Sequence, residues 1–252
     1  GRLGDHLADR DVGSGDQVLH IGLIVGRLLV VRQPRLGPGM GGLMQAADLI
    51  VLQQRGHDFG AAGAVAVAAP FGAVGYGTFI QRSAFRVREV DVRVANLPPD
   101  LDGLRIAHLS DIHLSPFLSE EEFSRAIDLA NETKPHMAAV TGDLVTAEGD
   151  PLHACLRQLA RLRTDAGVLG CLGNHEVYAR CQEEAERAGR RLGIYFLRGE
   201  NRLLRFGDAT LNIGGVDWRR GPRVAPGAER LLVAGATNLL LCHNPNGFDD
   251  AA

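Results

Sequence analysis

Residues 104–115 read LRIAHLSDIHLS, an apolar run that passes directly into a polar one. The apolar run from Leu104 to Leu109 predicts a short buried strand. Asp111 and His113 follow at the point where that strand would end. In open α/β sheets, ligands bind beyond the carboxyl ends of the strands, so polar residues at this point are candidate ligands.

The same arrangement recurs three times further along the chain. TGD at 141–143 and GNHE at 173–176 each follow an apolar run, and so does HNP at 243–245. One such motif alone is more often a turn residue or a satisfied polar group than a ligand. Aspartate or asparagine together with histidine at successive strand ends is not expected by chance. The set therefore predicts a metal site at four neighbouring strand ends.

Helices and strands are predicted to alternate between these motifs. Ser119 and Glu122 form a candidate capping box for a helix that Pro135 ends. An amphipathic helix is predicted over 152–162 and a polar helix over 182–191. Strands are predicted near 85–94, 136–141 and 167–172, near Tyr195, in a hairpin turning at Gly207-Asp208, and over 238–242. This order predicts the α/β class, with layers of helices covering a sheet.

The chain ahead of residue 82 is predicted to contain two segments. Residues 1–58 show no clear period and form an unassigned leader. Residues 59–81 are a candidate transmembrane or signal-anchor segment, because they carry no charge over a length that suits a bilayer. Their alanine and glycine content and Pro70 keep a small-residue linker or packed hairpin as the alternative. The globular domain is predicted over 82–252.

Composition limits the partners and the redox chemistry. A formal net charge of -3 gives no general attraction for nucleic acid, so we expect no nucleic-acid partner. The oligomeric state is left open. The four cysteines lie far apart without a CxxC pair, which favours packed thiols over a disulfide framework. Cys171 and Cys242 flank the motifs and are interpreted in the same way.

The donor types at the four motifs indicate which ions they suit. Carboxylate, carboxamide and imidazole occur together without cysteine, which is typical of sites for Mn, Fe or Zn and does not choose among them. Two divalent ions held close together need a shared carboxylate against their mutual repulsion. Asp143 is the natural bridge.

The motifs SDIHLS, TGDLV, GNHE and LLLCHNP resemble the successive motifs of calcineurin-like metallophosphoesterases over roughly residues 104–248. The resemblance implies that family's fold, a layered β-sandwich flanked by helices. It also implies two divalent metal ions. Their ligands would be Asp111 and His113 for the first ion, Asp143 as the bridge, and Asn174 and His243 for the second.

The resemblance further implies a catalytic group and a reaction. His175 would act on the leaving group as a general acid or charge stabiliser, and Glu176 would orient its neighbours. The leading hypothesis is a metal-dependent phosphoric ester hydrolase. A metal-bridging hydroxide would attack a phosphate mono- or diester, either a small molecule or a phospholipid-type substrate. The alternative is a non-catalytic, membrane-attached metal-binding domain.

Two further expectations concern the ends of the resemblance. Family members continue past the HNP motif to a GHxH motif that supplies one histidine to each metal, and no GHxH occurs here. We therefore expect an incomplete domain with impaired or absent hydrolysis. The match to the membrane-associated bacterial branch implies association with the bacterial inner membrane. Trp218, Arg219 and Arg220 are weaker candidates for contact with a phosphate or sugar, with a solvated arginine pair as the alternative.

Overall fold

The computed structural model describes residues 18–25, 61–79, 84–219 and 227–244. The chain divides into two compact units, of which one comprises residues 1–26 and 85–252 and the other residues 27–84. The first unit carries every predicted site residue. Its described part contains two β-sheets and the helices that flank them.

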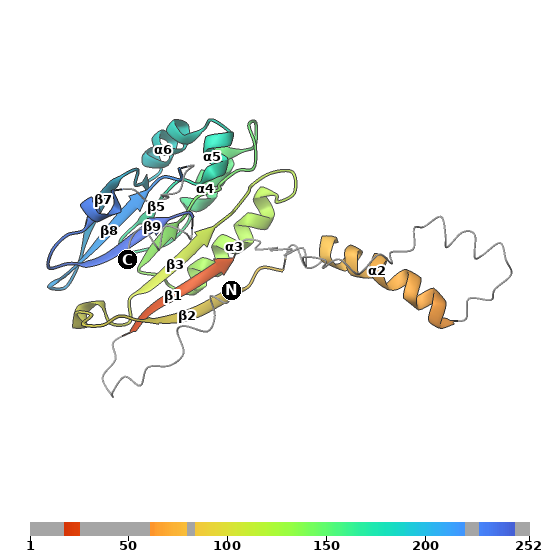
Figure 1. Cartoon of the computed structure of the whole chain (residues 1–252), viewed down its shortest axis with the longest axis horizontal. Helices are drawn as coiled ribbons and strands as arrows, with labels where there is room; N and C mark the ends of the chain where they lie inside the picture. The colour runs from red at the N-terminus through yellow and green to blue at the C-terminus, as the bar shows by residue number, and fades with distance from the viewer. Residues whose placement is uncertain (1–17, 26–60, 80–83, 220–226, 245–252) are drawn as a thin grey trace, which may run out of the picture. The chain divides into compact units, whose positions relative to one another are not determined.

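The larger sheet runs in the order β2-β1-β3-β4-β5-β6 (Figure 1). Its strands are β1 (Val18–Val25), β2 (Val87–Arg93), β3 (Arg105–Ser110), β4 (Met137–Val140), β5 (Val168–Gly170) and β6 (Ile194–Phe196). All neighbours are parallel except β1 and β2, which pair antiparallel. Strand β1 comes from a segment to which the sequence assigned no element. The central strand β4 is buried along its whole length, as expected when both faces of a sheet are covered.

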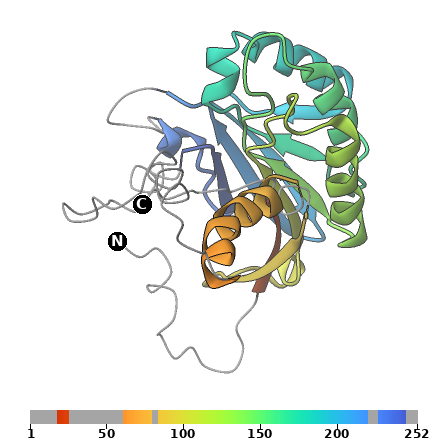
Figure 2. The same ribbon diagram turned by 90° about the vertical axis from the view of Figure 1, so that its right-hand side faces the viewer.

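Helices cover one face of this sheet (Figure 2). They are α3 (Glu120–Glu132), α4 (Leu152–Leu159), the short α5 (Asn174–Tyr178) and α6 (Gln182–Arg191). The capping box of α3 is confirmed: the Ser119 hydroxyl accepts from the Glu122 amide at 3.1 Å, and Glu122 Oε2 accepts from the Ser119 amide at 3.0 Å. Phe123 and Ile127 point from α3 into the core that α3 and α4 share with the sheet.

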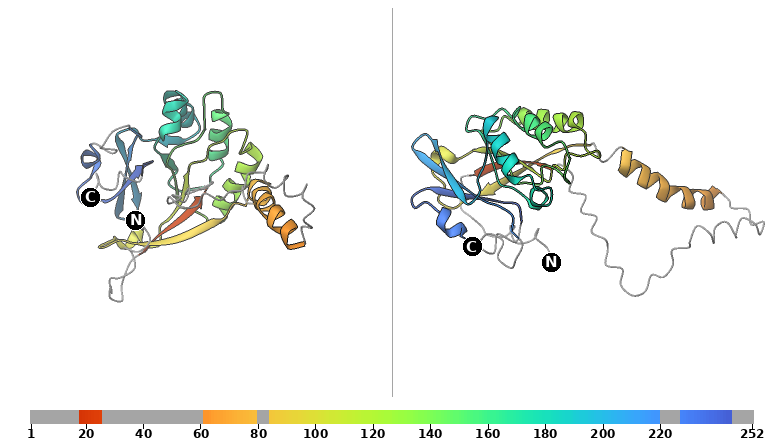
Figure 3. Two further views of the ribbon diagram at one scale, coloured as in Figure 1. Left: turned by 45° about the vertical axis from the view of Figure 1, so that its right-hand side comes forward. Right: turned by 90° about the horizontal axis from the view of Figure 1, so that it is seen from above.

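The second sheet lies against the opposite face of the first (Figure 3). It contains β7 (Glu200–Phe206), β8 (Ala209–Val216) and β9 (Thr237–Cys242). β7 and β8 form the predicted antiparallel hairpin, and β9 runs parallel to β8. Met137 and Leu169 from the first sheet share a core with Leu211 and Ile213 from the second. The predicted layered β-sandwich flanked by helices is confirmed. The described part of this unit also contains two short 3-10 helices, Pro99–Leu101 and Ala228–Leu231.

Strand β2 explains an irregular sequence pattern. Its apolar positions change parity along the strand, although its pairing with β1 is continuous. Phe85 and Val87 pack against the helix-side core, whereas Val92 and Val94 pack against the core between the sheets. Since alternate residues of a strand face opposite sides, a strand that contacts both cores changes parity.

The described part of the second unit is Ala84 and α2 (Ala61–Phe79), which lies within the predicted 59–81 segment and contains Pro70. Side chains of Val65, Phe71 and Val74 are exposed. Among the described residues, no helix combines the length and the hydropathy that crossing a membrane requires. The rest of the predicted leader, residues 1–17 and 26–58, lies outside the described residues.

Candidate metal centre

The loops after β3 and β4 lie side by side at the carboxyl edge of the larger sheet. The amide of His113 donates to the carbonyl of Asp143 at 2.8 Å, and the amide of Asp111 donates to that of Gly142 at 3.2 Å. Asp111, His113 and Asp143 have φ angles of 53°, 50° and 56°. This left-handed conformation is costly for residues with a Cβ and concentrates at functional sites. All three are predicted metal ligands.

Two glycines allow the loops after β4 and β5 to approach each other. A Cβ added to Gly142 would collide with the backbone of Gly173, and a Cβ added to Gly173 would collide with the Asp143 carboxylate. Gly142 also has a φ of 89°, which side chains rarely tolerate. The glycines of the TGD and GNHE motifs therefore bring Asp143 close to Asn174.

Glu176 links two loops at this edge of the sheet. Its side chain is fully buried. Oε2 accepts from the amides of Asp143 at 2.9 Å and Gly173 at 2.7 Å, and Oε1 accepts from the amide of Leu144 at 2.6 Å. The carboxylate thus ties the β4 loop to the start of α5. The structure gives it the contacts of an orienting residue, which is the role that the resemblance implied.

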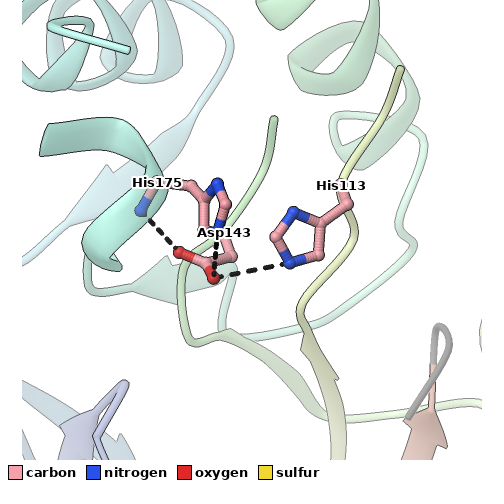
Figure 4. A group of neighbouring side chains, drawn as sticks. All are labelled: His113, Asp143 and His175. Carbon is pink, nitrogen blue, oxygen red and sulfur yellow. Dashed lines mark hydrogen bonds and ion pairs between the residues drawn. The ribbon is translucent and has the colours of Figure 1, made fainter. Parts of the chain in front are cut away.

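The Asp143 carboxylate lies at the centre of the site (Figure 4). Oδ1 accepts from the His175 amide at 2.9 Å. Oδ2 lies 3.5 Å from His113 Nε2, 3.9 Å from His175 Nε2 and 3.3 Å from His243 Nε2. One carboxylate oxygen therefore faces three imidazole nitrogens.

The fourth strand end comes from the other sheet. We expected the motifs at four neighbouring strand ends, but only β3, β4 and β5 are neighbours, and His243 follows β9 of the second sheet. That part of the prediction is wrong, because packing of one sheet on the other brings His243 to the site. Its Nδ1 lies 2.7 Å from the Thr141 carbonyl, and its Nε2 lies 3.0 Å from Asn174 Oδ1.

Backbone carbonyls set the orientation of two of the histidines. A carbonyl oxygen only accepts, so Nδ1 of His243 carries the proton that it donates to Thr141. His175 Nδ1 likewise donates to the Thr146 carbonyl at 2.7 Å. Both rings therefore turn Nε2 towards Asp143. Histidines that bind metal ions typically donate their other ring nitrogen in this way.

His243 and Asp143 shift each other's pKa. Burial by itself lowers the pKa of His243, but the hydrogen bond and charge of Asp143 outweigh it and raise the pKa to about 9. Burial by itself raises the pKa of Asp143, but hydrogen bonds from the His243 ring and the His175 amide leave it below its ordinary value. The buried carboxylate is ionised and needs positive charge beside it, from a proton or a cation.

The ligand atoms form two groups that fit divalent ions. His113, Asp143 and His175 form one, and Asp111, Asp143 and His243 form the other; within each group the ligand atoms lie within 4.8 Å of one another. Asp143 belongs to both groups, as a bridging ligand would. Asn174 joins the second group through Oδ1. All six predicted site residues are thus brought together, and His175 lies in the first group of possible ligands, although the resemblance implied a catalytic group there and not a ligand.

Comparisons with known proteins agree with this geometry. The model of the calcineurin-like phosphoesterase family matches residues 104–248, more than half of the chain. The chain belongs to this family. The match begins just ahead of β3 and ends beyond His243, so it includes all six site residues.

Three relatives show the range of similarity. A transmembrane protein with metallophosphoesterase domain from Bos taurus is 35% identical, over 36% of this chain and 21% of its own length. An uncharacterized metallophosphoesterase of Campylobacter jejuni is 32% identical, over 63% and 42%. The UDP-2,3-diacylglucosamine pyrophosphatase LpxG of Chlamydia muridarum is 26% identical, over 44% and 34%. The chain covers less than half the length of each of these three relatives.

Two threonines position histidines of the site through their backbone carbonyls, a role that was not predicted for either of them. Thr141 holds His243 through its carbonyl, and its hydroxyl lies 2.7 Å from His108 Nε2. Thr146 holds His175 through its carbonyl, and its hydroxyl lies 3.4 Å from His113 Nδ1. A residue that acts through its carbonyl can be of any type, so side-chain chemistry gives no signal for it. Position is the only clue, since Thr141 begins the TGD motif and Thr146 follows that motif by three residues.

The remaining predicted candidates lie around the family's site. Cys171 is buried, and burial raises its pKa well above the ordinary value, which confirms a packed thiol. Cys242 is partly buried, and its Sγ contacts the Asn244 carbonyl. Trp218 contacts Tyr178 and Arg219 is exposed, whereas Arg220 lies outside the described residues.

Proposed function

We propose that this chain carries the centre of a two-metal phosphoric ester hydrolase that cleaves a phosphate mono- or diester. The proposal rests on one observation: Asp143 Oδ2 faces His113, His175 and His243, and these three histidines come from two different sheets. A bridging carboxylate is what two neighbouring cations require.

The proposed ligands are Asp111 and His113 for one ion, Asp143 between the ions, and Asn174 and His243 for the other. Asp111 also lies within 4.8 Å of the His243 ligand atom, so it is close to both proposed ion positions. Divalent ions of the Mn, Fe or Zn type bound there would supply Lewis acidity, which stabilises charge on phosphoryl oxygens and lowers the pKa of water. Glu176 positions the Asp143 loop and the Thr141 carbonyl orients His243, so little reorganisation is needed when an ion binds.

His175 is proposed to serve the leaving group. Its Nδ1 proton is engaged by the Thr146 carbonyl, so Nε2 is the atom that would give a proton to the departing oxygen. The ring side chain is 27% exposed, which leaves it accessible to a substrate. A cationic ring at this position would also stabilise negative charge on the phosphoryl group.

The test compares metal binding and turnover. The chain is loaded with Mn²⁺, and hydrolysis of an aryl phosphodiester and an aryl phosphomonoester is compared with that of Asp143→Asn and His175→Ala variants. We expect Asp143→Asn to lose metal binding in calorimetry, and His175→Ala to keep the metal but lose turnover by about 10²–10⁴-fold. Detectable turnover that is equal in all three proteins would refute the mechanism. Tight metal binding without turnover in the parent chain would favour the alternative, a non-catalytic metal-binding domain.

The substrate class and cellular location are proposed more broadly. LpxG is named for a lipid-linked nucleotide substrate, which supports a small phosphoester or phospholipid-type substrate here. Relatives named as transmembrane proteins, together with the exposed apolar side chains of α2, support membrane association through residues 59–81. Carbonate extraction of membranes from expressing cells tests the location: retention in the membrane fraction supports anchoring through this segment, and release into the soluble fraction contradicts it.

A further inference from the structure

A row of aromatic rings leads away from the metal centre. The His113 and His175 rings lie 4.5 Å apart between centroids at an interplanar angle of 89°. His175 contacts the Tyr178 ring at 5.6 Å, and Tyr178 contacts the Trp218 ring at 5.8 Å. Each contact is within the range of a T-shaped aromatic pair. The row therefore connects the proposed leaving-group residue to two large rings outside the ligand set.

Tyr178 is placed beside the reaction site by the helix that carries His175. It is the last residue of α5 and lies three positions after His175, so both side chains point from the same side of the helix. Its ring is not needed for the core, since the residue is 54% exposed. An exposed ring next to a catalytic histidine is available to contact a substrate.

Trp218 is held in place by the second sheet. It follows β8 by two residues, and its amide donates to the Leu172 carbonyl at 3.1 Å, just ahead of the GNHE motif. Its ring meets Tyr178 at 72°, so the two rings form a corner that offers a ring face and a ring edge. Flat aromatic groups fit such corners by stacking on one ring and meeting the edge of the other.

The sequence beside both rings favours a planar group over an acyl chain. Exposed arginines follow both rings in sequence, Arg180 after Tyr178 and Arg219 after Trp218. An acyl chain would need an extended apolar groove, whereas guanidinium groups interact well with aromatic and heteroaromatic rings.

We propose that Tyr178 and Trp218 form a subsite for a planar aromatic leaving group, as in an aryl phosphate or a nucleotide. This inference rests on the proposed function, because the subsite takes its meaning from the phosphoryl site beside His175. It adds a specificity determinant to that function. Neither residue takes part in metal binding.

The chain contains one tryptophan, so its intrinsic fluorescence reports on the subsite directly. The Mn²⁺-loaded chain is titrated with phenyl phosphate, uridine monophosphate, cyclohexyl phosphate and inorganic phosphate. Cyclohexyl phosphate is the matched control, because its ring is similar in size to phenyl but is not flat. We expect phenyl phosphate or the nucleotide to bind at least about tenfold more tightly than cyclohexyl phosphate. The tighter binder of the two shows whether the subsite prefers a simple aryl group or a nucleotide base.

Variants at Tyr178 decide whether the ring is responsible. Tyr178→Phe should keep the preference, and Tyr178→Ala should remove it without changing the affinity for inorganic phosphate. Equal binding of the phenyl and cyclohexyl esters, or a preference that survives Tyr178→Ala, would overturn the subsite. Hydrolysis is assayed in parallel. A retained preference for the aromatic ester without turnover would refute the hydrolase and leave the subsite intact. Turnover without any such preference would refute the subsite and leave the hydrolase intact.

Discussion

The two halves of the candidate metal centre differ in how they are enclosed. The open half, His113 and His175, has side chains that are 31% and 27% exposed and comes from the larger sheet alone. The enclosed half is Asp111, Asn174 and His243; of these, His243 comes from the second sheet, and its side chain is only 9% exposed. The open half is available to substrate, whereas the enclosed half also joins the two sheets. Changes in the two halves should therefore have different consequences.

Replacing the residue that both halves share should have the largest effect. Asp143→Asn removes the charge that both ion groups require, so Mn²⁺ affinity should fall by more than about 100-fold at both positions. Calorimetric titration with Mn²⁺ measures this. Asp128→Asn, on the exposed surface of α3, is the matched control and should bind as the parent does. A variant that still binds two ions would show that Asp143 is not the bridge.

Replacing Glu176, which links the loops that carry both halves, should have the next largest effect. Glu176→Gln keeps one acceptor oxygen but turns amide hydrogens towards backbone N–H groups, so one or more buried donors lose their partner. We expect the free energy of unfolding in urea to fall by about 4 kcal/mol. Glu183→Gln, exposed on α6, should change it by less than about 0.5 kcal/mol. An equally small change for Glu176→Gln would show that the Glu176 carboxylate does not stabilise this edge of the sheet.

A direct comparison of the halves uses the same substitution in each. His243→Gln should destabilise the metal-free chain by about 3 kcal/mol, because a buried ring bonded to Thr141 and Asp143 is lost. His113→Gln should cost less than about 1 kcal/mol, since its ring is partly exposed. Each should weaken the binding of one ion. Equal destabilisation by the two variants would remove the distinction between the halves.

The smallest expected effect is a pH dependence confined to the enclosed half. The folded-state pKa of His243, about 9, lies above the ordinary value of 6.5, so the protonated ring stabilises the metal-free fold. That stabilisation is complete below the ordinary pKa and is lost as the pH rises through about 9. In EDTA, the free energy of unfolding should fall by about 2 kcal/mol from about pH 7 to about pH 9. The profile should be flatter in His243→Gln, and an unchanged slope would contradict this assignment.

Local rules predicted most of the fold. The capping box at Ser119 and Glu122, the polar helix over 182–191 and the hairpin at Gly207 all depend on short-range chemistry and occur as predicted. The strand at 18–25 was not predicted. Its pairing with β2 and β3 spans long sequence separations, which a local pattern does not reveal.

The sequence by itself determined which side chains meet at the site, because aspartate, asparagine and histidine at strand ends have few other reasons to recur. It also determined the family, through four motifs. Only the tertiary structure decided that His243 arrives from a second sheet, that the carbonyls of Thr141 and Thr146 orient the rings, and that Tyr178 meets Trp218. These contacts join residues that are distant in sequence or act through their backbone. They form only when the layers pack, and residue type alone does not predict them.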